Sequence, residues 1–274
     1  MSLLNDVQPA DKINPATDLK LKVLLVGDSG TGKSTGATTL PGKKLLIDLD
    51  GRSESLAGFP NLDIIKIVEK APNNPRAWLD LEALKEEIWS AIKTNKFGYD
   101  SLIVDGISAM CKISMNWSLL LTGSDNKLMN RSPGGGPAQP HYMPAMFRID
   151  RVINSLLALP IHILFTAHVE LFEDEHLKTL TYYPKITGKM RTEVANWFNE
   201  SYLTKTLKGG GGNTKYIWLT QSTGDRVPFI KSSLNQLGKY WTDPIEVDFD
   251  QSIKGFEMLI EKRFNQELTK ETKK

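Results

Sequence analysis

The residues best suited to chemistry lie in one glycine-rich run near the start of the sequence. This run fits the pattern G-x-x-x-x-G-K-[ST] at every position, and a threonine follows it. Its glycines permit tight turns in which successive backbone N–H groups point at phosphate oxygens, and a following helix adds its N-terminal dipole. The lysine would reach the β- and γ-phosphates, and the serine hydroxyl would ligate Mg²⁺. The predicted phosphate-binding residues are Gly27, Asp28, Ser29, Gly30, Thr31, Gly32, Lys33, Ser34 and Thr35.

Carboxylates that would complete this site follow two apolar runs. Asp105 ends the run SLIVD, where an acidic residue would support the magnesium ion together with Ser34. Asp48 and Asp50 end the run KLLIDLD, and side-chain alternation places both on one face of a strand. One of them could polarise an attacking water, or both could cap the following turn, and for Asp48 we prefer the capping role. Glu54 is a further candidate base.

Other nucleotide chemistries fit less well. The run at 48–51 spells the D-x-x-G of GTPases, but Asn95-Lys96 and Asn126-Lys127 both lack the aspartate of the guanine reader N-K-x-D. We therefore expect ATP with Mg²⁺ rather than GTP. A small-molecule kinase would need an arginine-rich lid, and arginines are sparse. The single cysteine, Cys111, excludes an internal disulfide framework and a cysteine-based zinc cage.

The elements that must position these residues form an alternating pattern. Short apolar runs predict buried strands over 21–26, 44–50, 62–68, 101–105 and 161–168. Amphipathic spacing predicts helices over 74–93 and 145–159. Strands alternating with helices indicate an α/β fold with a mainly parallel central sheet flanked by helices. After residue 170, β-like runs separated by turns predict antiparallel strands that extend the same sheet, with glycines 209–212 in a hairpin loop.

Composition favours one globular domain with two appendages. Hydrophobic residues make up 40% of the 274 positions and charged residues 24%, which is ordinary globular usage. We expect an N-terminal arm over 1–19, a core over 20–250 and a charged helical tail over 251–274. The opening is too polar for a signal peptide and no apolar run reaches membrane-spanning length, so we expect a cytoplasmic protein with no membrane partner. The net charge of +2 gives no indication of a nucleic-acid partner.

The order of these motifs resembles a known family. GDSGTGKST, KLLIDLD, LDIIKIV with its helix, YDSLIVDGISAM and ILFTAH are similar to the RecA-type recombinase core, in the same order and at similar spacing. Within that fold, the sequence is most similar to short phage-encoded ATPases, some of which anneal single strands of DNA. The later runs PKITGK and RVPFIKSSL also resemble this phage group. The resemblance covers roughly residues 20 to 235. It implies a P-loop NTPase of RecA-like type that hydrolyses ATP in a DNA-dependent manner and promotes phage recombination by annealing or strand exchange.

The predicted catalytic residues are Lys33, which comes from the phosphate-loop motif, and Asp50 and His168, which the resemblance implies. Asp50 stands where the family has a catalytic glutamate, and its shorter side chain could reposition the water or slow hydrolysis. His168 stands where the family has a polar γ-phosphate sensor, usually glutamine, and it can donate a hydrogen bond there. The alternative for His168 is a solvent-facing histidine at a strand end.

The resemblance also implies a place for DNA. Residues 122–143 occupy the position of the family's first DNA-binding loop, with cations and aromatic groups suited to backbone contact and base stacking. The implied DNA-binding residues are Lys127, Arg131, His141 and Tyr142, with Lys189 and Arg191 lining the same groove. The alternative is a long flexible loop without a ligand.

The resemblance extends to partners and location. It implies single-stranded DNA as a partner, a head-to-tail homo-oligomer or filament with ATP between neighbours, a single-strand-binding protein as a further partner, and the cytoplasm of an infected bacterium. Two other functions stay open. One is an ATP-gated loader or scaffold with little hydrolysis, and the other is a helicase-type motor.

Overall fold

A single mixed sheet organises the computed structural model, which describes residues 9, 19–71, 74–174, 179–209, 213–222, 226–249 and 255–271. The sheet has ten strands in the order β10-β8-β7-β1-β5-β4-β2-β3, with β6 paired to β5 and β9 paired to β7. The strands are β1 Lys22–Gly27, β2 Lys44–Asp48, β3 Leu62–Lys66, β4 Ser101–Asp105, β5 His162–Asp174, β6 Thr179–Pro184, β7 Glu200–Lys208, β8 Thr214–Leu219, β9 Lys231–Ser232 and β10 Ile245–Val247. The expected α/β fold class is confirmed.

Strand β5 lies between β1 and β4 and is parallel to both. β7 is also parallel to β1, which corrects the expectation that all strands after residue 170 are antiparallel. The reason is the crossover through α6 (Met190–Glu193) and the 3₁₀ turn η4 (Val194–Trp197), which returns the chain to the same sheet edge before β7 begins. The expectation holds for β8 against β7 and for β10 against β8.

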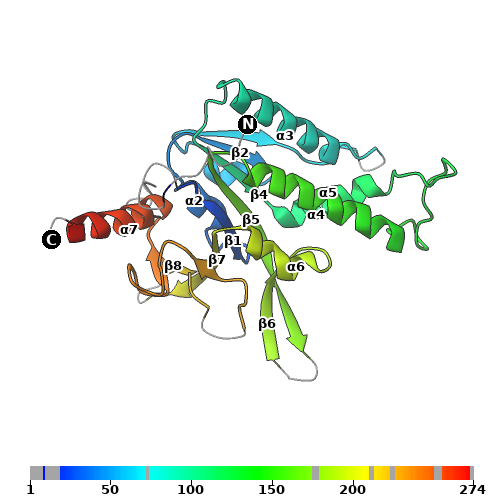
Figure 1. Cartoon of the computed structure of the whole chain (residues 1–274). Helices are drawn as coiled ribbons and strands as arrows, with labels where there is room; N and C mark the ends of the chain where they lie inside the picture. Colours follow the sequence, from blue (N-terminus) through cyan, green and yellow to red (C-terminus); the bar gives the residue numbers. More distant parts are fainter. Residues whose placement is uncertain are drawn as a thin grey trace.

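Strand β5 continues to Asp174, past the expected end at His168. Within the sheet its pairing with β1 stops at His168, opposite Gly27. From Val169 onward β5 pairs antiparallel with β6 instead. The two strands form a hairpin that projects from the body of the molecule (Figure 1).

Alternation along the central strands divides the core into two halves. Leu24 and Val26 of β1 face the larger half, which packs against α3 (Ala77–Lys93), α4 (Ile107–Ser118) and α5 (Gln139–Leu157). Val23 and Leu25 face the other half, beside the short α2 (Lys33–Ala37) and α7 (Phe256–Glu271). The two groups of helices lie apart in Figure 1, with α3, α4 and α5 together at one side. The P-loop strand is therefore buried on both faces, as a parallel central strand requires.

Two helices differ from the sequence expectation. Helix α4 follows β4 directly and was not predicted. Helix α5 begins at Gln139 rather than near 145, because Pro140 stands in the first turn, where its missing N–H is not needed. Ser114 of α4 donates to the Ala145 carbonyl of α5 over 3.0 Å. The end of the long loop over 122–143 is therefore helical and packed.

The structure describes the two predicted appendages, the N-terminal arm and the C-terminal tail, to different extents. The arm over 1–19 lies almost entirely outside the described residues. The tail over 251–274 contains α7, whose beginning belongs to the core: Phe256 and Leu259 are fully buried. The Phe256 ring lies 4.8 Å from Trp218 and 5.9 Å from Tyr202. Within the described part of the chain, none of the helices combines the length and the apolar composition that crossing a bilayer requires.

Candidate functional site

The phosphate-binding loop connects β1 to α2 at the carboxyl edge of the sheet. Gly30 and Gly32 both have φ of +78°, in the left-handed region that glycine adopts without strain. A Cβ at Gly27 would overlap Thr204 of the neighbouring β7, so glycine is required there for close strand approach. Helix α2 spans only five residues. The loop amides, rather than the dipole of a long helix, must therefore supply most of the attraction for phosphate.

Lys33 lies across the loop that it follows. Its Nζ donates to the carbonyls of Gly27 at 2.9 Å and Asp28 at 2.7 Å. Burial lowers the pKa of Lys33, and the nearby carboxylates of Asp105, Asp28 and Asp50 act in the opposite direction. The ammonium group is thus held at the mouth of the loop, in reach of a bound phosphate.

Three residues, one each from α2, β4 and β5, form a hydrogen-bonded group beside this lysine. Ser34 Oγ donates to Asp105 Oδ2 over 2.7 Å, and Thr166 Oγ1 of β5 donates to the other oxygen, Oδ1. The Gly106 N–H donates to Thr166 Oγ1 over 2.9 Å, which orients that hydroxyl toward the carboxylate. Such a set of hydroxyl and carboxylate oxygens fits a hard cation such as Mg²⁺.

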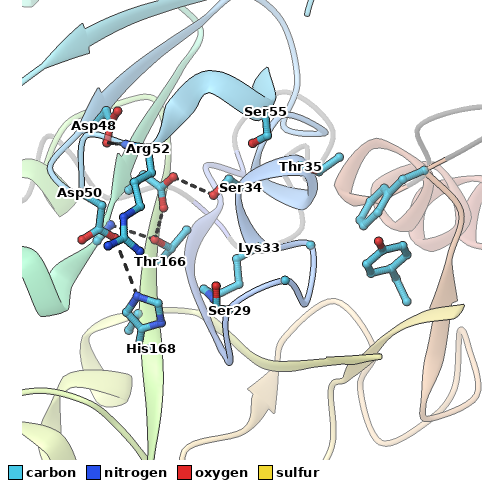
Figure 2. A pocket seen from close by; sticks show the side chains of 17 residues that line it. Ser29, Lys33, Ser34, Thr35, Asp48, Asp50, Arg52, Ser55, Thr166 and His168 are labelled. Carbon is cyan, nitrogen blue, oxygen red and sulfur yellow. Dashed lines mark hydrogen bonds and ion pairs between the residues drawn. The ribbon is translucent and has the colours of Figure 1, made fainter. Parts of the chain in front are cut away.

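Asp48 ends β2 and Asp50 follows it by two residues, and the two aspartates have different surroundings (Figure 2). Asp48 is buried and accepts hydrogen bonds from the N–H groups of Gly51 at 2.6 Å and Ser53 at 3.1 Å, so its expected capping role is confirmed. Asp50 is half-buried and faces the pocket, with its Oδ2 3.9 Å from His168 Nε2. The turn that Asp48 holds in place therefore presents Asp50 to the site.

Burial shifts both groups of the Asp50–His168 pair. The pKa of Asp50 is raised by burial and then by the charge of Asp105. The pKa of His168 is lowered by burial and then by Lys33, so the imidazole is neutral at pH 7 and can donate one hydrogen bond. A carboxylate with a raised pKa is a stronger base than an exposed one.

Glu54 does not belong to this pocket, which corrects its candidacy as the base. Its carboxylate is exposed and pairs with Lys66 of β3 over 3.0 Å. It is one of the first residues of the 3₁₀ turn η3 (Ser53–Leu56), and the neighbouring Ser55 lines the pocket instead.

Comparison with known proteins shows the family of the chain. The family model described as the AAA domain matches residues 19–223. The chain belongs to that family. Among solved structures, the RadB recombinase is 12% identical over 75% of this chain and 82% of its own, with a TM-score of 0.37. The ATPase DotB of Legionella pneumophila is 10% identical over 80% of this chain and 50% of its own, with a TM-score of 0.30. Neither likeness bears on activity, and no curated protein matches the chain.

The nucleotide pocket of this AAA domain has a volume of about 480 Å³ and includes residues that the sequence did not single out. Thr166 lies two positions before His168 on the same face of β5, so strand alternation could have found it. Arg52 follows Asp50 by two residues and brings a cation to the pocket. Tyr216 and Phe249 come from the last third of the chain, and no local spacing relates them to the loop. The added lining residues are Arg52, Ser55, Gly106, Thr166, Ala167, Tyr216 and Phe249.

A second recess, which we call the basic groove, lies beside the AAA nucleotide pocket and has a volume of about 600 Å³. It contains two of the predicted DNA-binding residues, Tyr142 and Arg191. The Arg191 guanidinium lies 4.1 Å from the centre of the Phe172 ring and 3.9 Å from the Glu170 carboxylate. The residues that line the basic groove include Ser108, Lys112, Tyr142, Glu170, Phe172, Lys185 and Arg191.

The other predicted DNA-binding residues lie elsewhere. Lys127, Arg131 and Lys189 are exposed but do not line the basic groove. Arg131 donates to the Leu119 carbonyl over 2.9 Å. His141 is a correction: it is fully buried, and its Nδ1 accepts a hydrogen bond from the Ala138 N–H over 3.0 Å. The first turn of α5 places this side chain inside the protein, where it cannot contact DNA.

The nucleotide pocket and the basic groove are joined at His168. The Lys185 N–H donates to the His168 carbonyl over 2.7 Å. Ser108 Oγ donates to the Lys185 carbonyl over 2.9 Å, and the His168 N–H donates to Ser108 Oγ over 3.3 Å. The backbone behind the pocket-facing imidazole is thereby fixed to two groove residues.

Proposed function

We propose that this AAA-domain protein is a magnesium-dependent ATPase whose turnover is coupled to single-stranded DNA in the basic groove. In this proposal it acts in DNA recombination, by annealing or strand exchange. The observation that carries the proposal is the closed set of hydrogen bonds among His168, Ser108 and Lys185. These bonds join a residue that faces the nucleotide pocket to residues that line a basic recess.

The phosphate end of the pocket is assigned to four side chains. Lys33 contacts the β- and γ-phosphates, while Ser34 and Asp105 hold Mg²⁺, with Thr166 orienting the Asp105 carboxylate. When bound, Mg²⁺ neutralises charge on the phosphate oxygens. Because Ser34 and Thr166 already bond to the two oxygens of Asp105, the carboxylate needs little reorientation when the nucleotide enters.

Asp50 and His168 are assigned to the reacting end. Asp50 accepts a hydrogen bond from the attacking water and takes its proton as the water oxygen bonds to the γ-phosphorus; the bond from that phosphorus to the bridging oxygen breaks at the same step, and ADP leaves with the electron pair. Neutral His168 donates its N–H to an oxygen of the γ-phosphoryl group. The 3.9 Å separation of Asp50 Oδ2 and His168 Nε2 allows both to face one reacting group.

Single-stranded DNA is assigned to the basic groove because the side chains of the groove combine charge with partly exposed aromatic rings. Lys112 and Lys185 are exposed and can pair with backbone phosphates. Tyr142 and Phe172 offer ring faces for unpaired bases, and stacking on them does not depend on sequence. Loss of the γ-phosphate changes the hydrogen bonding of His168, and the backbone bonds to Lys185 carry that change to the groove.

The proposal includes an assembly. By the resemblance to RecA-type recombinases, the protein acts as a head-to-tail homo-oligomer with ATP between neighbours, alongside a single-strand-binding protein. A phage origin and a place in the cytoplasm of an infected bacterium belong to the same proposal.

The test is ATP turnover with and without a long single-stranded oligonucleotide. Wild-type turnover is expected to rise several-fold with the oligonucleotide and less with a duplex of the same length. Lys33→Ala should abolish turnover in both conditions, because it removes the phosphate-binding cation. A matched control is Lys96→Ala, which changes an exposed lysine in the loop before β4. If the turnover rate is the same with and without DNA although ATP binds tightly, the coupling of turnover to DNA is rejected and an ATP-gated scaffold is favoured.

A further inference from the structure

Two aromatic side chains line the nucleotide pocket but have no part in the phosphate chemistry described above. Tyr216 lies on β8, and Phe249 follows β10 by two residues. Their ring centres are 5.2 Å apart, and the ring planes are inclined at 49°. Both residues are only partly buried, so ring surface remains available to the pocket. Phe249 also lies outside the segment that matches the AAA domain family, residues 19–223.

The order of the strands places these rings at one end of the bound nucleotide. The phosphate loop follows β1, which stands in the middle of the sheet. Asp50, Asp105 and His168 come from the β2, β4 and β5 side of β1, whereas Tyr216 and Phe249 come from the β8 and β10 side. A triphosphate whose γ-phosphate meets the first group must therefore extend its nucleoside toward the second.

The rings of Tyr216 and Phe249 also lie so close to the phosphate loop that a side chain at Gly32 would collide with them. A Cβ on Gly32 would lie 2.7 Å from Phe249 Cε2 and 3.0 Å from Tyr216 Cδ1. The same construction on Gly36 would bring the Cβ to 3.6 Å from Phe249 Cζ. The rings thus lie against Gly32, which precedes α2, and Phe249 also approaches Gly36 within that helix.

We propose that Tyr216 and Phe249 form the base-binding wall of the pocket, on which the nucleobase of ATP packs. This inference rests on the proposed nucleotide-binding function. Stacking on one aromatic ring is worth roughly 5- to 150-fold in affinity when the ring is removed. The wall acts on the base alone, so it should not contribute to binding of a phosphate chain that lacks one.

The experiment compares MgATP with magnesium tripolyphosphate, by calorimetry on the full chain. Phe249→Ala and Tyr216→Ala are each expected to weaken ATP binding by roughly 5- to 150-fold and to leave tripolyphosphate binding within about twofold. Tyr99→Ala is the matched control, because Tyr99 is an aromatic residue at the other end of β4 that bonds to Asp63. It should bind both ligands as the wild type does.

A second pair of variants separates stacking from support of the loop. Phe249→Tyr keeps a ring face and should keep ATP affinity, whereas Phe249→Leu keeps apolar bulk but loses the ring and should weaken ATP binding. Equal weakening of ATP and tripolyphosphate would overturn the proposal, since the rings would then only support Gly32. Unchanged ATP binding in the Leu and Ala variants would overturn it as well. A wild-type protein that binds neither ligand would instead reject the proposed nucleotide-binding function itself.

Discussion

The nucleotide pocket and the basic groove meet at His168 but are built in opposite ways. In the pocket, Ser34 and Thr166 each donate to one oxygen of Asp105, so the polar groups satisfy one another before any ligand enters. In the groove, Lys112 and Lys185 are exposed, and Arg191 rests on the Phe172 ring. The first arrangement is preorganised and depends on every member, whereas the second offers separate charges. Changes in the pocket should therefore be large and cooperative, and changes in the groove small and additive.

The largest effect expected from this contrast concerns the base. Asp50→Asn should lower turnover by about 10²- to 10⁴-fold, because the amide cannot accept the proton of the attacking water. Glu54→Gln should leave turnover within about twofold, since Glu54 pairs with Lys66 outside the pocket. Single-turnover phosphate release measures both. Equal losses in the two variants would show that the pocket does not distinguish these neighbouring carboxylates.

The next effect tests whether the pocket network is closed. Thr166→Val keeps the shape of the side chain but removes the hydroxyl that bonds to Asp105 and accepts from Gly106. Leaving those partners unsatisfied should cost about 1–3 kcal/mol of folding free energy, or roughly 2–10 °C in Tm. Thr166→Ser keeps the hydroxyl and is the matched control. Thermal melting measures the Tm of both variants. A Thr166→Val protein with the Tm of the wild type would mean that the network does not stabilise the fold.

The same contrast explains what could be predicted from the sequence. The loop at 27–34 and the strand that ends at Asp105 follow from short runs, because each motif lies within one turn or one strand. Tyr216 and Phe249 could not be predicted, since only the strand order brings them to Gly32. The prediction for His141 was wrong because the resemblance placed it in a DNA-binding loop, whereas a helix with Pro140 in its first turn begins there. Local spacing thus predicts the phosphate site well and surfaces assembled from distant segments poorly.

Smaller and additive effects are expected in the groove. Lys112→Gln and Lys185→Gln should each lower the slope of log affinity for single-stranded DNA against log salt by about 0.7, because each removes one phosphate contact. In the double variant the slope should fall by about 1.4, which is the sum of the two single effects. Fluorescence anisotropy over a salt series measures the slopes. Lys96→Gln should keep the wild-type slope, and groove variants that also keep it would place the DNA elsewhere.

The smallest effect is a stability difference with a defined sign. Burial and Asp105 raise the pKa of Asp50 in the folded protein, so the folded state holds that proton more tightly than the unfolded state. Above the raised pKa, ionised Asp50 therefore opposes folding, and Asp50→Asn should be more stable than the wild type. The gain should stay below about 1 kcal/mol, or roughly 2–4 °C, because the carboxylate is partly exposed.

This gain should disappear as the pH falls through the raised pKa toward that of an unfolded aspartate, where both states of the wild type become protonated. Glu54 provides the opposite sign: its pKa is lowered by a backbone hydrogen bond and by Lys66, so Glu54→Gln should lose rather than gain stability at neutral pH. Thermal melts from pH 8 to pH 4 measure both variants. An Asp50→Asn protein that melts below the wild type at neutral pH would show that the Asp50 carboxylate stabilises the fold. In that case, the pocket would not disfavour the ionised form of Asp50, and the argument that its raised pKa makes it a stronger base would fail.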